Sequence, residues 1–197
     1  MDATRIEPLS AETLNGARIQ ANSFLGARKA ACGVLPYSCC PMGNSEFGAI
    51  YRKDPDKYTT SAVAIRSSDG RVVGFVEMSL HGQNRDWFAS RLHTVRPGEA
   101  YIEQMSVSAQ MRGQGIGTRL LQWSEDTAKS RGASVLSLGV VKGNPAERLY
   151  HRFGFQSIGH TSFGANLGMC CLLGCPHGQF GGHMMEKPII PESIEHD

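Results

Sequence analysis

The sequence of 197 residues lacks an excess of charge of either sign. Its 20 lysines and arginines nearly balance its 18 aspartates and glutamates, which leaves a formal net charge of +2 at pH 7. Binding to nucleic acid phosphates needs basic residues gathered on one face, and the sequence has no such cluster, so we expect no nucleic acid partner. The chain also lacks any apolar run approaching the roughly 20 residues of a membrane-spanning helix. We therefore expect no membrane span.

A secretory signal is also missing from the first residues, because they contain acidic side chains and no apolar core ahead of a cleavage site. A cytoplasmic location is the interpretation that fits. Hydrophobic residues make up 41% of the chain and charged residues 19%, which is typical of a folded globular protein. We expect one domain over residues 1–189 and an acidic tail over 190–197. The sequence leaves the oligomeric state open, a homodimer included.

The six cysteines do not follow the paired spacing of a zinc site. They form two groups, Cys32, Cys39 and Cys40, and Cys170, Cys171 and Cys175. Adjacent cysteines rarely bind one tetrahedral zinc ion together, although His177 and His183 would supply further ligands. We expect free thiols in two glycine-rich loops and no metal site, with a zinc ion or a structural disulfide as the alternatives.

Turn residues and hydrophobic periodicity predict strands that alternate with helices. The expected strands are 4–9, 61–66, 72–80, 101–108, 135–141, 155–159 and 183–189, and the expected helices are 10–31, 116–131 and 145–153. Ser-Asp-Gly after residue 67 makes the second and third strands a hairpin. Residues 32–58 are expected to form loop and short helix, and residues 81–99 an irregular insertion. This order indicates an α/β domain with a mixed sheet.

The expected helix 145–153 begins with capping residues. Asn144 can accept a hydrogen bond from a free amide as the N-cap, Pro145 suits the first helical position, and Glu147 supplies the acid of a capping box. Apolar residues then recur along one stripe of the helix, which includes Tyr150 and Phe153.

The most informative feature is Arg-Gly-Gln-Gly-Ile-Gly at residues 112–117, between a strand and the most regular helix. Glycines in this position let the backbone approach a ligand while the first helical amides point outward, which makes a site for an anion such as a pyrophosphate. A P-loop is excluded because Thr118 and Arg119 follow the last glycine. A dinucleotide-binding GxGxxG motif is excluded because glycines occupy every second position.

Arg112, Gly115 and Gly117 fit the spacing Arg/Gln-x-x-Gly-x-Gly/Ala, which resembles the acetyl-CoA motif of the GNAT superfamily of N-acetyltransferases. The preceding MSVS strand and NPAERLYHRFGF at residues 144–155 resemble further parts of that family. The resemblance implies a GNAT-like fold with a mixed, mainly antiparallel sheet flanked by helices. It also implies direct transfer of an acetyl group from acetyl-CoA to a primary amine of a protein, peptide or small molecule, with no metal.

The resemblance implies which residues bind the cofactor. Backbone groups of Met105, Ser106 and Val107 would pair with the pantetheine arm. The pyrophosphate would lie on the turn formed by Arg112, Gly113, Gln114, Gly115, Ile116, Gly117 and Thr118. Asn144 lies six residues before Tyr150, whereas many family members place the asparagine seven residues before it, so a contact with the cofactor competes with the N-cap role of Asn144.

Tyr150 matches the general acid of the family, which protonates the leaving coenzyme thiolate. Its alternative role is packing on an apolar helix stripe. A phenol with an ordinary pKa near 10 stays protonated at neutral pH, as this acid requires.

Glu103 is the candidate general base, because strand alternation predicts that it shares a face with Met105 and Val107. Glu77, His81 and a chain of water molecules are the alternatives. The acceptor is expected to contact residues 24–58, 81–99 and 160–182, with aromatic side chains such as Tyr51 and Tyr58 among the walls of its site. A catalytically silent acyl-CoA-binding module, with cysteine-rich interaction loops, is the alternative function.

Overall fold

The computed structural model describes residues 3–24, 43–85, 90, 93–160 and 182–189. Its strands are β1 (Thr4–Pro8), β2 (Ser61–Arg66), β3 (Val72–Leu80), β4 (Glu99–Val107), β5 (Val135–Val141), β6 (Gln156–His160) and β7 (Gly182–Pro188). Its helices are α1 (Leu14–Phe24), α2 (Asn44–Lys53), α4 (Ile116–Ser130) and α5 (Glu147–Phe153), with 3-10 turns η2 (Pro55–Tyr58) and η3 (Ala109–Met111). All six cysteines, the expected end of the first helix and the expected tail lie outside the described residues.

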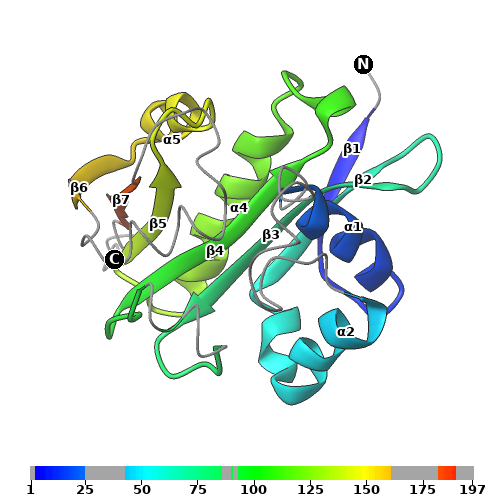
Figure 1. The fold of residues 1–197 in the computed structure, drawn as a ribbon, viewed down its shortest axis with the longest axis horizontal. Helices are drawn as coiled ribbons and strands as arrows, with labels where there is room; N and C mark the ends of the chain where they lie inside the picture. Colours follow the sequence, from blue (N-terminus) through cyan, green and yellow to red (C-terminus); the bar gives the residue numbers. More distant parts are fainter. Residues whose placement is uncertain (1–2, 25–42, 86–89, 91–92, 161–181, 190–197) are drawn as a thin grey trace, which may run out of the picture.

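The strands form one sheet in the order β1-β2-β3-β4-β5-β7-β6 (Figure 1). Every neighbouring pair is antiparallel except β4 and β5, which run parallel. The predicted α/β fold with a mixed, mainly antiparallel sheet is therefore confirmed. The hairpin of β2 and β3 has the expected bounds, whereas β4 begins two residues earlier than expected, at Glu99.

The turn between β2 and β3 forms for the reason that its sequence indicates. The Asp69 carboxylate accepts hydrogen bonds from the Arg66 side chain, at 2.9 Å, and from the Arg71 amide, at 3.2 Å. Gly70 has a φ of +70°, in the left-handed region that glycine reaches without steric cost.

Helices cover both faces of the sheet (Figure 1). On one face, Leu120 and Leu121 of α4 belong to a buried cluster with Val76 of β3 and Ile102 of β4. On the other face, α1 and α2 pack against β2 and β3 in a second buried cluster. Tyr51 of α2 is fully buried in that cluster, so the expectation that it lines an acceptor site is wrong.

Strand β4 contains a β-bulge. Gln104 pairs with Glu77 of β3 and Ile102 pairs with Met78, so Glu103 is an extra residue without a partner on β3. The bulge interrupts the two-residue alternation, and Ile102 and Met105 both pack toward α4. Glu103 therefore lies on the opposite face, and the prediction that it shares a face with Met105 and Val107 is wrong.

Strands β4 and β5 part at a point that we call the fork. Their parallel ladder begins at Glu99 and Val135 and ends after four residue pairs, at Ile102 and Leu138. Beyond that point, within the described part of the chain, residues 104–107 of β4 pair only with β3, and residues 139–141 of β5 pair only with β7. This leaves β4 with a free backbone edge that leads to the glycine-rich turn.

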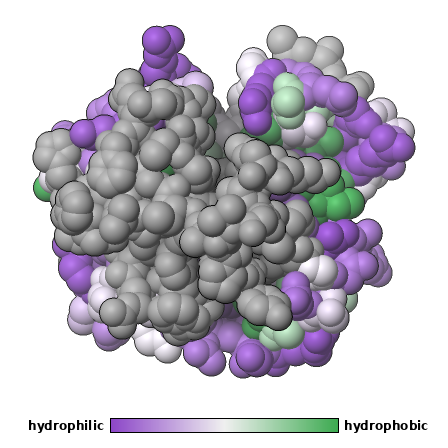
Figure 2. Space-filling view, viewed as in Figure 1, coloured by the Kyte–Doolittle hydropathy of each residue, from purple (hydrophilic) through white to green (hydrophobic). Residues whose placement is uncertain are grey.

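The described surface is mainly hydrophilic in the view of Figure 2, with scattered hydrophobic residues. Among the described residues, Ile19 and Ile158 are the large hydrophobic side chains that are exposed. A search of the described helices finds none with the length and apolarity to cross a membrane.

Candidate active site

The glycine-rich turn leaves its backbone open to a ligand. Gly113 and Gly115 both have a φ of +76°, and a Cβ atom at either position would meet no atom within 4 Å. Within the described part of the chain, the amides of residues 113–118 donate no hydrogen bond, whereas the Arg119 amide bonds to the Gly115 carbonyl at 3.1 Å. Unpaired amides at the start of a 15-residue helix fit a phosphate group.

The side chains of this turn have several different roles. The Arg112 Nε donates to the Val107 carbonyl at 3.2 Å, and the side-chain Nε2 of Gln114 lies 3.9 Å from the Met111 sulfur. Ile116 is buried in the core, and Thr118 is exposed. Gly117 has a packing role, because a Cβ there would lie 2.9 Å from Leu149 Cδ2 of α5.

The free edge of β4 presents backbone groups beyond the fork. The Ser108 amide bonds to Val73 of β3 at 2.8 Å, so strand alternation points the backbone groups of Met105 and Val107 away from β3 and toward the free edge. The Ser106 hydroxyl is buried and has no hydrogen-bond partner among the described residues. Such an edge can pair with an extended arm of a ligand as a further strand would.

Tyr150 lies in the middle of α5 with 8% of its surface exposed. Burial raises the pKa of its hydroxyl to about 12, so the group keeps its proton across the neutral range. Its ring packs against Phe155, with ring centroids 6.0 Å apart. Among the described residues no side chain or backbone group hydrogen bonds to its hydroxyl. A protonated hydroxyl without an internal partner can donate to a ligand.

The start of α5 differs from the expected capping box. The Asn144 Oδ1 accepts a hydrogen bond from the Ala146 amide at 3.0 Å, but the N-cap position is Ala146, so Asn144 and Pro145 lie in a turn before the helix and not at the N-cap and first helical positions expected for them. The helix itself begins only at Glu147, and the Glu147 carboxylate lies 3.1 Å from His183 of β7 instead of reaching back to Asn144. The capping-box prediction is therefore wrong, because this carboxylate lies beside a histidine of a neighbouring strand and not beside the Asn144 amide.

Glu103 is held by an arginine that sequence reasoning missed. The Arg85 guanidinium contacts both carboxylate oxygens, through Nε to Oε1 and through Nη2 to Oε2 at 3.1 Å. Arg85 also donates to the His93 carbonyl and lies over the Tyr101 ring, 5.3 Å from its centroid. The side chains of Arg85 and Glu103 are only 7% and 16% exposed.

A second buried ion pair lies on the same face. The Lys57 ammonium of η2 donates to Glu77 Oε1 at 2.9 Å, and Gln104 Nε2 donates to Glu77 Oε2 at the same distance. Burial alone would lower the pKa of Lys57, but the neighbouring Glu77 carboxylate raises it above its ordinary value. Both carboxylate oxygens of Glu77, an alternative base, therefore accept hydrogen bonds from side chains of the protein.

Glu99, at the start of β4, is a further buried carboxylate without a signal in the sequence. It is 1% exposed and accepts hydrogen bonds from His93 Nε2 at 2.8 Å, from the Arg96 amide and side chain at 2.8 and 3.0 Å, and from Ser137. Burial by itself would raise the pKa of Glu99, but these donors hold it well below its ordinary value. Tyr101 stacks on His93 with ring centroids 4.5 Å apart.

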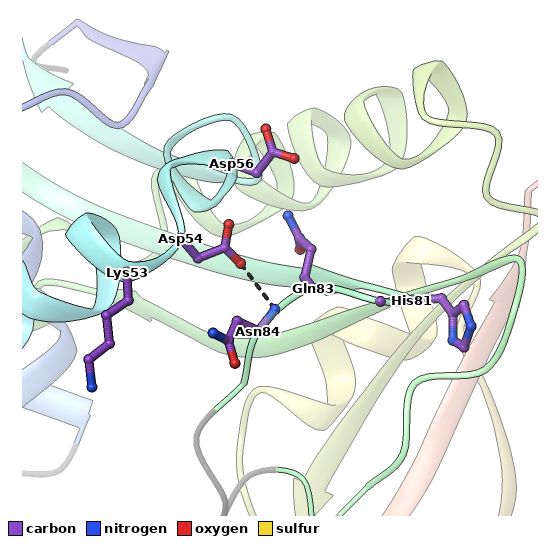
Figure 3. Close-up of a pocket in the computed structure, with 7 residues that line it drawn as sticks. Lys53, Asp54, Asp56, His81, Gln83 and Asn84 are labelled. Carbon is purple, nitrogen blue, oxygen red and sulfur yellow. Dashed lines mark hydrogen bonds between the residues drawn. The ribbon is translucent and has the colours of Figure 1, made fainter.

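An open surface pocket of about 460 Å³ lies elsewhere, where β3 ends beside α2 and η2 (Figure 3). It is lined by Lys53, Asp54, Asp56, His81, Gly82, Gln83 and Asn84. The Asn84 amide donates to Asp54 Oδ2 at 3.1 Å across it. His81, another alternative base, lies at this pocket and hydrogen bonds through Nδ1 to the Val95 carbonyl at 2.9 Å.

The described residues include no group of three or more His, Cys, Asp or Glu side chains that could hold a metal ion.

Comparison with known proteins identifies the family. Residues 36–155, more than half of the chain, match the model of the acetyltransferase (GNAT) family. The chain belongs to the GNAT acetyltransferase family. Among curated GNAT relatives, it is 34% identical over 91 residues to the aminoalkylphosphonate N-acetyltransferase of Salmonella typhimurium, a match covering 45% of this chain and 52% of that protein.

A second relative, the streptothricin acetyltransferase of Streptomyces lavendulae, is 33% identical over 111 residues, covering 56% of this chain and 50% of that protein. The chain thus spans about half the length of the curated relatives that it matches.

Solved GNAT structures share the fold. An N-acetyltransferase from Staphylococcus aureus Mu50 aligns with a TM-score of 0.68 at 20% identity, over 95% of this chain and 99% of that one. The structure of yncA from Salmonella typhimurium with its cofactor acetyl-CoA aligns with a TM-score of 0.62 at 18% identity, over 100% of this chain and 99% of that one.

Proposed function

We propose that this GNAT family member is an N-acetyltransferase that moves an acetyl group from acetyl-CoA directly to a primary amine. The observation that carries the proposal is the junction of two open backbone surfaces: the free edge of β4 leads into a turn whose amides, at residues 113–118, have no partner among the residues that the structure describes. An extended arm that ends in a pyrophosphate matches this junction. The acetyl-CoA complex of yncA, a protein of the same fold, supports the assignment.

The residues predicted from the motif would divide the binding between them. Backbone groups of Met105 and Val107 would pair with the pantetheine arm, and the Ser106 hydroxyl, which has no partner among the described residues, belongs to the residue between them. The amides from Gly113 to Thr118 would hold the pyrophosphate, with Arg112, Gln114 and Ile116 fixing the shape of the turn. Asn144 would act through the turn before α5, in which its side chain accepts a hydrogen bond from the Ala146 amide.

Acid and base groups lie on opposite faces of the sheet in this proposal. Acetyl-CoA, when bound, supplies a thioester whose carbonyl carbon the amine attacks and whose thiolate leaves. Tyr150, on the α4 side, would give its proton to the departing sulfur. Glu103, on the α1 and α2 side, would take the proton that the amine nitrogen loses as the new C–N bond forms. In this proposal, the reacting groups meet from the two faces at the fork, where β4 and β5 part.

The acceptor in this proposal is a small-molecule amine. Two relatives are named for acetylation of small molecules, an aminoalkylphosphonate and streptothricin, which favours this class over a protein or peptide. The test is thiol release on mixing the protein with acetyl-CoA and a panel of amines. Release that depends on both components supports the function, and binding of acetyl-CoA without release to any amine contradicts it.

A silent acyl-CoA-binding module is the second candidate, favoured by one observation. Glu103 is paired with Arg85 through both of its oxygens, so in this structure both oxygens face the guanidinium instead of an amine. Calorimetry with acetyl-CoA detects binding under either candidate. Thiol release with an amine separates them, because only an enzyme consumes the thioester.

A further inference from the structure

The Tyr101 side chain reaches from β4 to β5 at the fork. Ile102 packs toward α4, so strand alternation places Tyr101 on the opposite face, where its ring stacks on His93 with ring centroids 4.5 Å apart. The Gly139 backbone amide donates a hydrogen bond to the Tyr101 hydroxyl. Gly139 is the first residue of β5 beyond the four-pair ladder. The hydroxyl therefore lies at the inner end of the gap between the two strands.

Gly139 leaves room for this hydroxyl. Leu138 and Val140 belong to the buried cluster that packs against α4, so the missing side chain of Gly139 lies on the same face as Tyr101. A Cβ atom at position 139 would lie 3.1 Å from Tyr101 Oη, which would force the hydroxyl to move. Gly139 is itself exposed, so the fork is open to solvent beside the hydroxyl. A ligand can reach the hydroxyl from there.

The Tyr101 hydroxyl is a hydrogen-bond donor at neutral pH. Burial raises the pKa of Tyr101 well above its ordinary value, and the nearby Glu103 carboxylate raises it further, so the group keeps its proton. Its oxygen accepts from Gly139, whereas its O–H has no acceptor among the residues that the structure describes. A hydroxyl that already accepts one hydrogen bond donates a stronger one.

The free edge of β4 leads from the glycine-rich turn to this hydroxyl. The edge covers residues 103–107, five positions of extended strand at about 3.3 Å each, and its inner end is the last pair of the ladder. With the pyrophosphate on the turn, a pantetheine arm that pairs along this edge runs toward the fork. Its thioester would then lie at the inner end of the gap, beside the Tyr101 hydroxyl.

We propose that Tyr101 is a further catalytic residue, whose hydroxyl donates a hydrogen bond to the acetyl carbonyl oxygen. The inference rests on the proposed function and adds a residue to that same site. As the amine nitrogen bonds to the carbonyl carbon, the electron pair of the C=O π bond moves onto this oxygen, and its negative charge strengthens the hydrogen bond. The pair returns as the C–S bond breaks, and the thiolate takes its proton from Tyr150. Tyr101 keeps its own proton throughout.

Infrared difference spectra test the contact without turnover. Bound acetyl-CoA that is isotopically labelled at the thioester carbonyl should show this stretch at a lower frequency in the parent protein than in Tyr101→Phe, because the hydrogen bond weakens the C=O bond. A purely structural role of the ring would leave the frequency unchanged. Equal frequencies overturn the inference and leave the proposed function intact. A shifted carbonyl without thiol release to any amine overturns the proposed function.

Calorimetry gives a second readout of the same contact. Tyr101→Phe should bind acetyl-CoA about 2- to 10-fold more weakly than the parent, the size of one lost hydrogen bond. It should bind CoA, which has no thioester carbonyl, as tightly as the parent does. Equal losses for the two ligands would mean that the hydroxyl does not contact the acetyl group, which overturns the inference.

Turnover measures the catalytic effect. Tyr101→Phe should lower kcat about 10²- to 10³-fold, the usual loss for one donor to an oxyanion, with little change in the KM of the amine. Tyr51→Phe is the matched control, because it removes another buried phenolic hydroxyl, whose neighbour is Ser61 Oγ at 3.5 Å, and should keep kcat. A kcat of Tyr101→Phe within about twofold of the parent contradicts the catalytic role.

The variant Gly139→Ala displaces the hydroxyl without removing it. In the parent background we expect a lower kcat and a smaller carbonyl shift, with CoA affinity unchanged. In the Tyr101→Phe background there is no hydroxyl to displace, so Gly139→Ala should cause no further loss. An equal loss in both backgrounds overturns the inference. If Tyr101→Phe does not fold, a carbonyl frequency in Gly139→Ala that equals that of the parent overturns it alone.

Discussion

Gly117 of α4 and Leu149 of α5 touch with no room for a methyl group between them, since a Cβ at position 117 would lie 2.9 Å from Leu149 Cδ2. The contact ties the glycine-rich turn to the helix that carries Tyr150, the residue after Leu149. Among the glycines of the turn, Gly117 therefore differs from Gly113 and Gly115, whose missing side chains leave open space.

Gly117→Val should push α5 away from α4. We expect a loss of about 1–3 kcal/mol in the free energy of unfolding from overpacking, together with a lower kcat because Tyr150 moves with its helix. Urea denaturation and steady-state kinetics measure the two effects. Gln122→Val, on the exposed side of the same helix, should change neither by much. If kcat is unaltered although the Gly117→Val protein is less stable, the contact between Gly117 and Leu149 does not position Tyr150.

Gly115→Glu should abolish acetyl-CoA binding, because a carboxylate would enter the space beside the unpaired amides and repel the phosphates. Gly70→Glu is a matched control: Gly70 has a φ of +70° and Gly115 a φ of +76°, and neither has an atom within 4 Å of its missing Cβ. The backbone strain is thus similar, and only the first variant should lose binding in calorimetry. Similar affinities for the two variants would exclude a phosphate site at the turn.

Tyr150→Phe should preserve folding and acetyl-CoA binding while lowering turnover roughly 10²- to 10⁴-fold, the usual contribution of a general acid. The change removes one hydroxyl that has no described partner and keeps the ring packed on Phe155. Since burial raises the pKa of Tyr150 to about 12, its proton is retained up to about pH 10, and kcat should show no alkaline loss from this group below that pH. Turnover within about twofold of the parent, at saturating acetyl-CoA, would leave Tyr150 as a packing residue.

Glu99→Gln should change how stability depends on pH. The pKa of Glu99 lies below its ordinary value of 4.5 in the folded protein, so this carboxylate stabilises the fold above about pH 4.5 and ceases to do so as the pH falls through its folded value. The variant should lose about 2–4 kcal/mol at pH 7, since His93 and Arg96 keep an incomplete partner.

Denaturation curves at pH 7 and near pH 3 measure this prediction. The difference in stability between the variant and the parent should shrink at the lower pH. Glu12→Gln, at an exposed position, should follow the parent throughout. A difference that stays constant with pH would mean that Glu99 does not stabilise the fold through its charge.

Local sequence patterns predicted the elements well because short-range chemistry decides them. Ser-Asp-Gly fixed both ends of the β2–β3 hairpin, and Gly132, with a φ of +74°, ends α4 where the sequence indicated. The glycine-rich turn was found from spacing alone for the same reason, since positive φ values at alternate positions require glycine.

Long-range pairing decides what the sequence could not indicate. The bulge at Glu103 arises from the register between β3 and β4, which reverses the face expected from alternation. Arg85 comes from an irregular segment, so its pairing with Glu103 has no periodic signal. Tyr51 was expected at a binding surface because of its aromatic type, yet it is buried with Phe47 and Phe75 by the tertiary packing of α2.

The four-pair ladder between β4 and β5 has a mechanical consequence. It joins a four-stranded part of the sheet, β1 to β4, to a three-stranded part, β5 to β7, through far fewer residue pairs than hold either part together. A ligand that pairs with the free edge of β4 while contacting α5 would add contacts between the two parts of the sheet and so hold them together. Amide hydrogen exchange in β5 and β7, which do not border the glycine-rich turn, should therefore slow when that ligand binds.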